Sequence, residues 1–435
     1  MNNDLPAELH TEILKYLNDI DIFSLSTTSS VWRTLITLKH ILSLKRISSA
    51  MLSHIHDLLP ISLLFNLSFK TGNLDILKYA MKNNDNKWSE YADYDIRFAA
   101  QYGHLHVLKW AYKHGCGWSK LCCSSAAKNN HLIVLQWLRK KQCPWTSQTC
   151  KLAAKHNHLA TLQWAYLNGC PMKPDISKDA AMAGNLEILQ WLQSVNQKFD
   201  ASTTAYAALG GHLDVLKWLY DQNCEWNSDV CDNAAENNNL EMLQWARSKG
   251  CDWSAQTCAM AAYNNNFDMI KWLRNNNCPW TSHTCAMASL GNNFEMLKWC
   301  RDNGCDWDSR VMTKAALNGN MQIIKWCYRN GCPVDKYICQ TTLYENNFNT
   351  LKWLIKHGVK WDDHFLIHAL SSNAIEIFLW ACDNGCPVDM LVCCKAIDHS
   401  NSEINEWAKN YKDVFGIDDS IISKIRNNEQ FFWCT

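Results

Sequence analysis

Apolar and polar positions along the chain repeat with a period of 27 residues. Tyr79 begins the series, and after 31 residues a tryptophan follows at positions 110, 137, 164, 191, 218, 245, 272, 299, 326, 353, 380 and 407. A fixed period of about 20 to 50 residues is typical of a stacked repeat array. We therefore expect about thirteen units over residues 63–425.

Each unit predicts a helix that contains its tryptophan. In one unit an apolar arc of about 220° is formed by Leu213, Val215, Leu216, Trp218, Leu219 and Tyr220. A helix that is apolar over more than half of its circumference packs on several sides. This pattern predicts an inner position between neighbouring units.

A second, shorter helix is predicted in each unit. Nine residues after the tryptophan comes a side chain suited to cap a helix, at Ser119, Thr146, Asp200, Asn227, Ser254, Thr281, Asp308, Asp335, Asp362 and Asp389. Small residues such as Ala153 and Ala154 let two helices approach closely, and residues such as Gly103 and Gly115 allow the left-handed end of a helix. No segment alternates with period two, so we expect an all-α fold.

The unit resembles the ankyrin repeat. The segment GHLDVLKWL at residues 211–219 is similar to the second helix of that family, and QTCKLAA at residues 148–154 is similar to its first helix. The family's unit has about 33 residues, and the residues missing here fall where the family builds its hairpin finger. The resemblance implies a solenoid of helical pairs without long fingers. The short Cys-Pro-Trp units are similar to arrays encoded by large DNA viruses.

The N-terminal region breaks the repeat. In LPAELHTEILKYL, residues 5–17, Leu9, Ile13, Leu14 and Leu17 line one helical face. The region resembles an F-box, with matching positions at Leu5, Pro6, Glu8, Leu9, Ile13, Leu14, Tyr16, Leu17, Asp21, Leu25, Ser29, Trp32, Arg33 and Leu35. The match is weaker over residues 28–31. The alternative is an ordinary helical cap that shields the first repeat.

The F-box resemblance implies a partner, the Skp-type adaptor of cullin–RING ubiquitin ligases. By that resemblance, the adaptor would contact Leu5, Pro6, Leu9, Ile13, Leu14 and Leu17. We expect an F-box over residues 1–45, a helical linker over 46–62, the ankyrin-like array over 63–425 and a C-terminal tail over 426–435.

Charge and composition narrow the classes of function. The 42 Lys and Arg residues balance 42 Asp and Glu residues, which argues against nucleic-acid or membrane binding. No stretch of about 18 apolar residues occurs, and the N-terminus lacks a signal-peptide pattern. The 22 Cys residues are interpreted as free thiols in a reducing compartment. We expect a monomer in the cytoplasm, or the host cytoplasm if the chain is viral, with the nucleus possible.

The Trp, Cys and His series each leave two interpretations. The Trp residues eight positions after the helix Trp could stack on single-stranded nucleic acid, but packing between units is favoured. The two Cys series could bind zinc, yet equivalent residues of stacked helices lie about 8–10 Å apart, so small buried side chains are favoured. His104, His131, His158 and His212 occupy a position held elsewhere by Asn, which favours a hydrogen bond to a turn.

No catalytic constellation is visible, and we expect no enzyme activity, metal or cofactor. The leading hypothesis is a substrate receptor that docks on a ligase and holds a target protein. A plain binding scaffold or decoy without ligase contact is the alternative, and a redox protein is a third. Predicted target contacts are variable first-helix positions: Ser125, Lys151, Lys178, Tyr206, Asn233, Met260 and Lys314.

Overall fold

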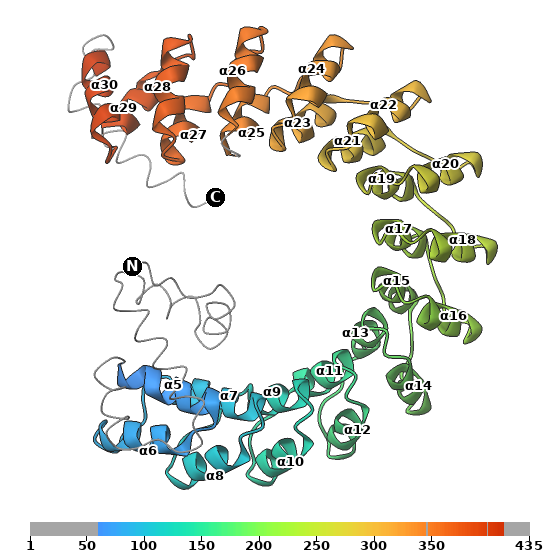
Figure 1. Ribbon diagram of the computed structural model, residues 1–435, viewed down its shortest axis with the longest axis vertical. Helices are drawn as coiled ribbons and strands as arrows, with labels where there is room; N and C mark the ends of the chain where they lie inside the picture. The colour runs from blue at the N-terminus through green and yellow to red at the C-terminus, as the bar shows by residue number, and fades with distance from the viewer. Residues whose placement is uncertain (1–59, 345–346, 398, 413–435) are drawn as a thin grey trace, which may run out of the picture. The chain divides into compact units, whose positions relative to one another are not determined.

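The computed structural model describes residues 60–344, 347–397 and 399–412 (Figure 1). These residues form helices joined by turns and loops, with no strand among them. The chain divides into two compact units, Met1–Trp226 and Asn227–Thr435, which are described separately. The predicted F-box, all but the last residues of the predicted linker, and the predicted tail lie outside the described residues.

The first unit contains six described helix pairs. Their helices are α5 (Ile61–Thr71), α6 (Leu74–Lys82), α7 (Ala92–Gln101), α8 (Leu105–Lys113), α9 (Cys122–Lys128), α10 (Leu132–Lys140), α11 (Ser147–Lys155), α12 (Leu159–Leu167), α13 (Ile176–Met182), α14 (Leu186–Ser194), α15 (Ala201–Leu209) and α16 (Leu213–Asp221).

The second unit contains seven described helix pairs. Their helices are α17 (Asp229–Glu236), α18 (Leu240–Ser248), α19 (Ala255–Tyr263), α20 (Phe267–Asn275), α21 (Ser282–Leu290), α22 (Phe294–Asp302), α23 (Ser309–Leu317), α24 (Met321–Arg329), α25 (Ile338–Tyr344), α26 (Phe348–Lys356), α27 (Phe365–Ser371), α28 (Ile375–Asp383), α29 (Met390–Ile397) and α30 (Ser402–Lys412).

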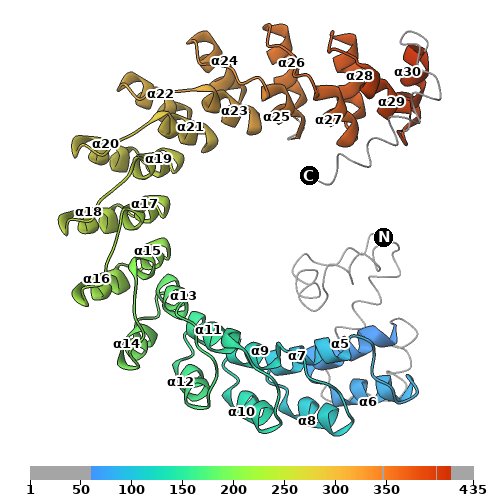
Figure 2. The ribbon, with the colours of Figure 1, turned by 180° about the vertical axis from the view of Figure 1, so that it is seen from behind.

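Within each unit the helices form two rows (Figures 1 and 2). The first helix of every pair has an odd number and packs against the first helices before and after it, as α9 does against α7 and α11. We call this the first-helix row, and the even-numbered helices form the second-helix row. The alanine pairs make the close packing possible, because residues such as Ala153 and Ala154 are fully buried. The predicted all-helical solenoid without fingers is confirmed.

The apolar arc of the second helix is only partly enclosed. Val215, Leu216 and Leu219 are fully buried, whereas Trp218 and Tyr220 are half-buried. The repeated tryptophans of the second helices are likewise half-buried. The second helices therefore pack on their own first helix and on neighbouring pairs, and they keep one edge toward solvent.

Local capping explains where the helices begin. The side chains of Thr146 and Thr281 accept hydrogen bonds from backbone N–H groups two residues later, and Asp200 accepts one from Thr203. Ser119 and Asp362 make the same kind of bond just ahead of their helices. These bonds satisfy amides that the first helical turn leaves free. The predicted capping positions are confirmed at these residues.

Left-handed residues end the helices as predicted. Gly103 and Gly115 have φ of +76° and +79°, a region that Gly enters without steric cost. At Gly103 an added Cβ would lie 2.8 Å from the ring of His131. The turn therefore needs glycine both for its backbone conformation and for the approach of the next pair.

A side chain at the start of several second helices joins successive pairs. Asn185 Nδ2 donates to the carbonyls of Ala154 and Lys155, at 2.6 and 3.2 Å. His104 and His158 act in the same way, with Nε2 at 3.1 Å and 2.9 Å from backbone carbonyls of the preceding pair. These carbonyls close the preceding first helix and have no partner within it. The predicted turn hydrogen bond is confirmed at both histidines.

Replacing Asn185 by alanine should loosen the array locally. The Lys155 carbonyl loses its donor, whereas the Ala154 carbonyl still accepts from the Asn157 amide at 3.3 Å. The expected cost is about 1–3 kcal/mol in free energy of unfolding. Hydrogen exchange of the α11–α14 amides and urea unfolding measure the effect. Asn168→Ala is the matched control, because that side chain bonds only within its own helix, to Trp164. Equal effects of the two substitutions would contradict the assignment.

Candidate target-binding surface

The seven predicted target contacts all lie in first helices. In the first unit, Ser125, Lys151, Lys178 and Tyr206 lie in α9, α11, α13 and α15. In the second unit, α17, α19 and α23 carry Asn233, Met260 and Lys314. Within each unit the predicted residues therefore belong to the first-helix row. Their contact with a target stays a prediction.

Two of these residues are already engaged within the chain. Lys151 Nζ lies 3.3 Å from Asp175 Oδ2 and 3.1 Å from Asp179 Oδ2, and Lys178 Nζ lies 3.3 Å from Asp200 Oδ2. Burial opposes ionisation of Asp200, but hydrogen bonds from Thr203 and Lys178 outweigh it and lower the pKa of the carboxyl. The lysines thus link α11, α13 and the start of α15, and only part of each side chain faces solvent.

Met260 is a poor candidate for target contact. Its side chain is only 8% exposed, and Met287, at the same position of the next pair, is equally buried. A flexible apolar side chain at this position gains free energy by packing against the neighbouring helices. Variability along the sequence therefore did not indicate exposure here. Tyr206 is 39% exposed and remains available for contact.

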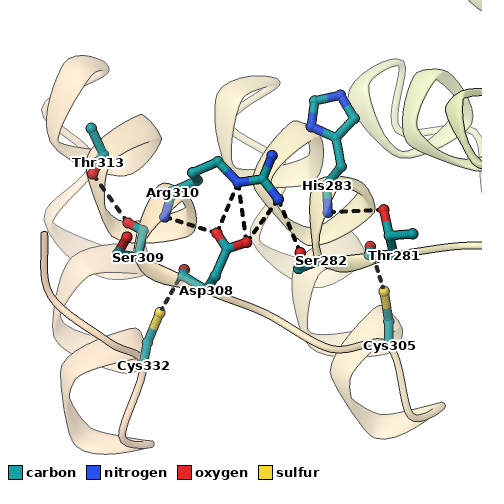
Figure 3. Close-up of polar contacts among 9 residues, drawn as sticks. All are labelled: Thr281, Ser282, His283, Cys305, Asp308, Ser309, Arg310, Thr313 and Cys332. Carbon is teal, nitrogen blue, oxygen red and sulfur yellow. Dashed lines mark hydrogen bonds and ion pairs between the residues drawn. The ribbon is translucent and has the colours of Figure 1, made fainter.

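In the second unit, Arg310 forms a polar clamp between two first helices (Figure 3). Its Nε and Nη2 donate to both carboxylate oxygens of Asp308, with Nη2 at 2.7 Å, and Nη2 also donates to Ser282 Oγ at 3.0 Å. Asp308 also caps α23 by accepting from the Arg310 amide at 3.0 Å. The Arg310 guanidinium lowers the pKa of Asp308 to about 2. The clamp fixes the start of α23 against the start of α21.

The loop tryptophans pack between helix pairs. Trp145 lies edge-on to Trp164 of the next helix pair, with ring centroids 6.1 Å apart, and the Arg139 guanidinium lies 4.0 Å from the Trp145 ring centroid. Three further arginines cover loop tryptophans in the same way, as Arg247 does Trp253, Arg274 does Trp280 and Arg301 does Trp307. The predicted packing of the loop tryptophans between helix pairs is confirmed, although these side chains are half-buried rather than enclosed.

Sequence reasoning missed the covering residue, although the repeat contained a signal for it. Four units with a loop tryptophan carry arginine two residues after the helix tryptophan, and two others carry tyrosine there. Tyr112 stacks on Trp118 at 5.4 Å between centroids, and Tyr220 packs on Trp226 at 4.9 Å. Arg and Tyr share a flat face that covers indole. Correlating these two positions across units would have revealed the contact.

The cysteines behave as small buried residues. All described cysteines are free, and among them only Cys224 and Cys382 are partly exposed. The two series meet inside a helix pair, where Cys123 Sγ lies 3.9 Å from the carbonyl oxygen of Cys143. Burial raises the pKa of Cys382 to about 12 and that of Cys393 to about 11. Such thiols are poor nucleophiles.

Two further observations apply to the described part of the chain alone. It holds no group of three or more His, Cys, Asp or Glu side chains placed to bind a metal ion. None of its helices has the length and apolar character that crossing a membrane requires.

Comparison with known families finds one match in the N-terminal region and one within the repeat array. Residues 3–44 match the family model of the F-box domain, and residues 231–274 match that of ankyrin repeats in many copies. The chain contains an F-box and ankyrin repeats. An F-box followed by ankyrin repeats supports the architecture of a ubiquitin-ligase substrate adaptor. No curated protein matches the chain.

Solved structures offer only distant likenesses to this F-box and ankyrin-repeat chain. The pentatricopeptide repeat protein PPR10 from maize is 11% identical, with a TM-score of 0.34, and the match covers 94% of this chain and 78% of that one. PPR10 in complex with an 18-nt psaJ RNA element is 10% identical, with a TM-score of 0.27, over 95% and 80%. Likenesses this weak carry no argument about function.

Substitution of Arg310 should raise the pKa of Asp308. In Arg310→Ala the carboxyl loses its strongest partner, so its pKa moves from about 2 toward its ordinary value of 3.8. The depressed pKa stabilises the folded chain above pH 3.8, and this contribution is lost as the pH falls toward 2. In the variant the folded and unfolded pKa values converge, so this pH-dependent contribution shrinks toward zero. Carboxyl NMR titration measures both, with Arg329→Ala, an exposed arginine of α24, as control. An unchanged Asp308 pKa would refute the clamp.

Thiol labelling should separate exposed from buried cysteines. In the native chain we expect iodoacetamide to modify Cys224 first among the described cysteines. The other cysteines are buried except Cys382, and the pKa of Cys382, raised to about 12, leaves little reactive thiolate. Peptide mapping by mass spectrometry identifies the modified sites, and labelling in denaturant gives the full set. Rapid native modification of a buried cysteine such as Cys258 would favour the redox hypothesis instead.

Proposed function

We propose that the chain is a non-catalytic substrate receptor of a cullin–RING ubiquitin ligase. The F-box docks on the Skp-type adaptor of the ligase, and the first-helix row of the array binds a target protein. The observation that carries this proposal is the F-box match over residues 3–44 ahead of helix pairs that begin with α5 at Ile61. One docking motif and one extended binding array thus share a chain.

The F-box side of the proposal has a physical basis in size. A domain of about 40 residues cannot build a large core of its own, so it gains stability by burying an apolar face on a partner. The residues proposed to contact the adaptor are Leu5, Pro6, Leu9, Ile13, Leu14 and Leu17. They combine the Leu-Pro opening with one face of the helix that follows.

The array side rests on how the first-helix row is held. Asn185 ties the start of α14 to the end of α11, and Arg310 ties the start of α23 to that of α21. Such bonds between successive pairs keep the exposed residues of a row at a fixed spacing. A target bound there is held near the ligase, which raises the effective concentration of its lysines. The chain supplies position, and the other ligase subunits supply the chemistry. Free buried thiols favour a reducing compartment, and we place the protein in the cytoplasm as a monomer.

The adaptor interaction can be tested by affinity purification. The full chain should recover a Skp-type adaptor and cullin from a eukaryotic lysate, and Leu5→Ala/Pro6→Ala should recover at least about tenfold less, because hot-spot apolar contacts each contribute above 1 kcal/mol. Quantitative mass spectrometry of the captured proteins gives the ratio. The matched control is Leu167→Ala, which removes an apolar side chain that is 80% exposed in the array.

The outcomes distinguish a ligase receptor from a plain scaffold or decoy. Adaptor recovery that Leu5→Ala/Pro6→Ala abolishes and Leu167→Ala preserves supports the ligase receptor. Absence of adaptor with the wild-type chain would instead favour a plain scaffold or decoy. Recovery that is unchanged in Leu5→Ala/Pro6→Ala would place the adaptor contact elsewhere.

A further inference from the structure

The balanced net charge conceals a strong separation of charge. Residues 96–174 contain eleven Lys or Arg residues, six His residues and no Asp or Glu. The rest of the chain contains the remaining 31 Lys and Arg residues and all 42 Asp and Glu residues. The acid-free segment runs through α8 to α12 and lies within the first unit. A formal charge of +11 is thus carried by three consecutive helix pairs and their loops.

Part of this charge forms one surface on the first-helix row. Lys128 ends α9 and Lys155 ends α11, so they occupy equivalent positions of neighbouring first helices, and Lys120 precedes α9. All three side chains are exposed. Together with His156, which follows Lys155, they are called the basic surface here. His158 holds its place by bonding to the Lys128 carbonyl, at 2.9 Å.

The charges of the basic surface lack partners within the described residues. The nearest acids in the sequence are engaged elsewhere, since Asp93 accepts from the Gly117 amide at 2.8 Å and Asp175 and Asp179 pair with Lys151. No described carboxylate lies within 4.0 Å of Lys120, Lys128 or Lys155. A set of exposed cations without counter-charges is complementary to an anionic partner.

The cations also act on one another. Burial lowers the pKa of His156, and the positive charges of Lys128, His158 and Lys155 lower it further. The positive charges of side chains from α9, α11 and the turn after α11 therefore repel one another. An anion placed among them would relieve this repulsion, so the arrangement favours an acidic ligand over a neutral one.

The aromatic residues of the preceding pair, α7 and α8, favour a protein partner over single-stranded nucleic acid. Base stacking needs open aromatic faces, but the ring of Tyr94 is covered by Arg97 at 4.3 Å, and Tyr112 stacks on Trp118. His114 lies 3.8 Å from the Trp110 centroid in a stacked geometry. Leu121 is exposed beside the cations and offers an apolar contact.

We infer that the basic surface of α9 and α11 binds a segment of the target protein that is rich in Asp and Glu. This rests on the proposed function, in which the first-helix row holds a target for ubiquitination. The acidic segment runs along α9 from Lys120 before its start to Lys128 at its end and continues to Lys155 at the end of α11. Its carboxylates pair with these three lysines. Leu121 contacts an apolar residue within the segment.

Binding of a defined peptide to the full chain tests the inference. The probe is a short fluorescein-labelled peptide of Asp and Glu with interspersed Leu, and anisotropy reports its Kd. Lys120→Gln/Lys128→Gln/Lys155→Gln should weaken binding by about tenfold or more, since three ion pairs are removed at a surface with few other contacts. Added salt should weaken binding to the wild-type chain as well.

A matched variant controls for net charge and folding. Lys217→Gln/Lys325→Gln/Lys356→Gln removes the same charge from exposed positions of second helices α16, α24 and α26 and should leave the peptide Kd within about twofold of wild type. Circular dichroism melting checks that both variants fold. The same peptide with Asn and Gln in place of Asp and Glu should bind only weakly.

Several results would overturn the inference. Equal Kd values for the two triple variants would remove the basic surface from binding. Tighter binding of oligo-thymidine than of the peptide would assign the surface to nucleic acid, and tighter binding to phosphatidylserine vesicles would assign it to a membrane. Failure of the adaptor purification with intact peptide binding would refute the ligase role alone, whereas adaptor recovery without peptide binding would refute only this inference.

Discussion

The array depends on one hydrogen bond that is repeated from pair to pair. The last carbonyls of a first helix have no partner inside that helix. In several pairs the Asn or His that opens the second helix of the next pair donates to them, and in others the donor is Asn264 or Asn318, which ends the next first helix. Asn293 does this for Ala262 and Tyr263, and Asn347 for Ala316 and Leu317. The carbonyls of Tyr263 and Leu317 receive their donor from the next repeat, whereas those of Ala262 and Ala316 also accept from backbone N–H groups in the turns of their own repeats. Stacking is thus built into each unit.

The two rows of helices expose different kinds of side chain. On the second-helix row, the tryptophans are covered by Arg or Tyr of the same pair and by the edge of the next tryptophan. On the first-helix row, buried alanines and caps occupy the inner positions, while Tyr206, Lys128 and Lys155 face outward. The first-helix row can therefore differ from unit to unit without disturbing the packing. A receptor that selects a target needs such a surface.

The net charge of the whole chain does not describe the charge of its individual surfaces. A net charge of zero argued against anionic partners, but electrostatic recognition depends on the local field, which falls off within about 10 Å in salt. The acid-free segment keeps its cations within three helix pairs. Some of these cations are neutralised, as Lys151 is by Asp175 and Asp179, and those at the ends of α9 and α11 are not.

Features set by local backbone chemistry could be predicted from the sequence. The Trp period, the caps at Thr146 and Asp200, and the left-handed turn at Gly103 each depend on a few neighbouring residues, so the helix pairs and their stacking followed from the sequence. The burial of Met260, the Arg139 contact with Trp145 and the Lys151 ion pairs depend on the register between helices. Sequence spacing within one helix does not determine that register, because it is decided by how neighbouring first and second helices pack. The repeat and the domain order were therefore determined by the sequence, and only the tertiary structure decided which side chains remain free to bind.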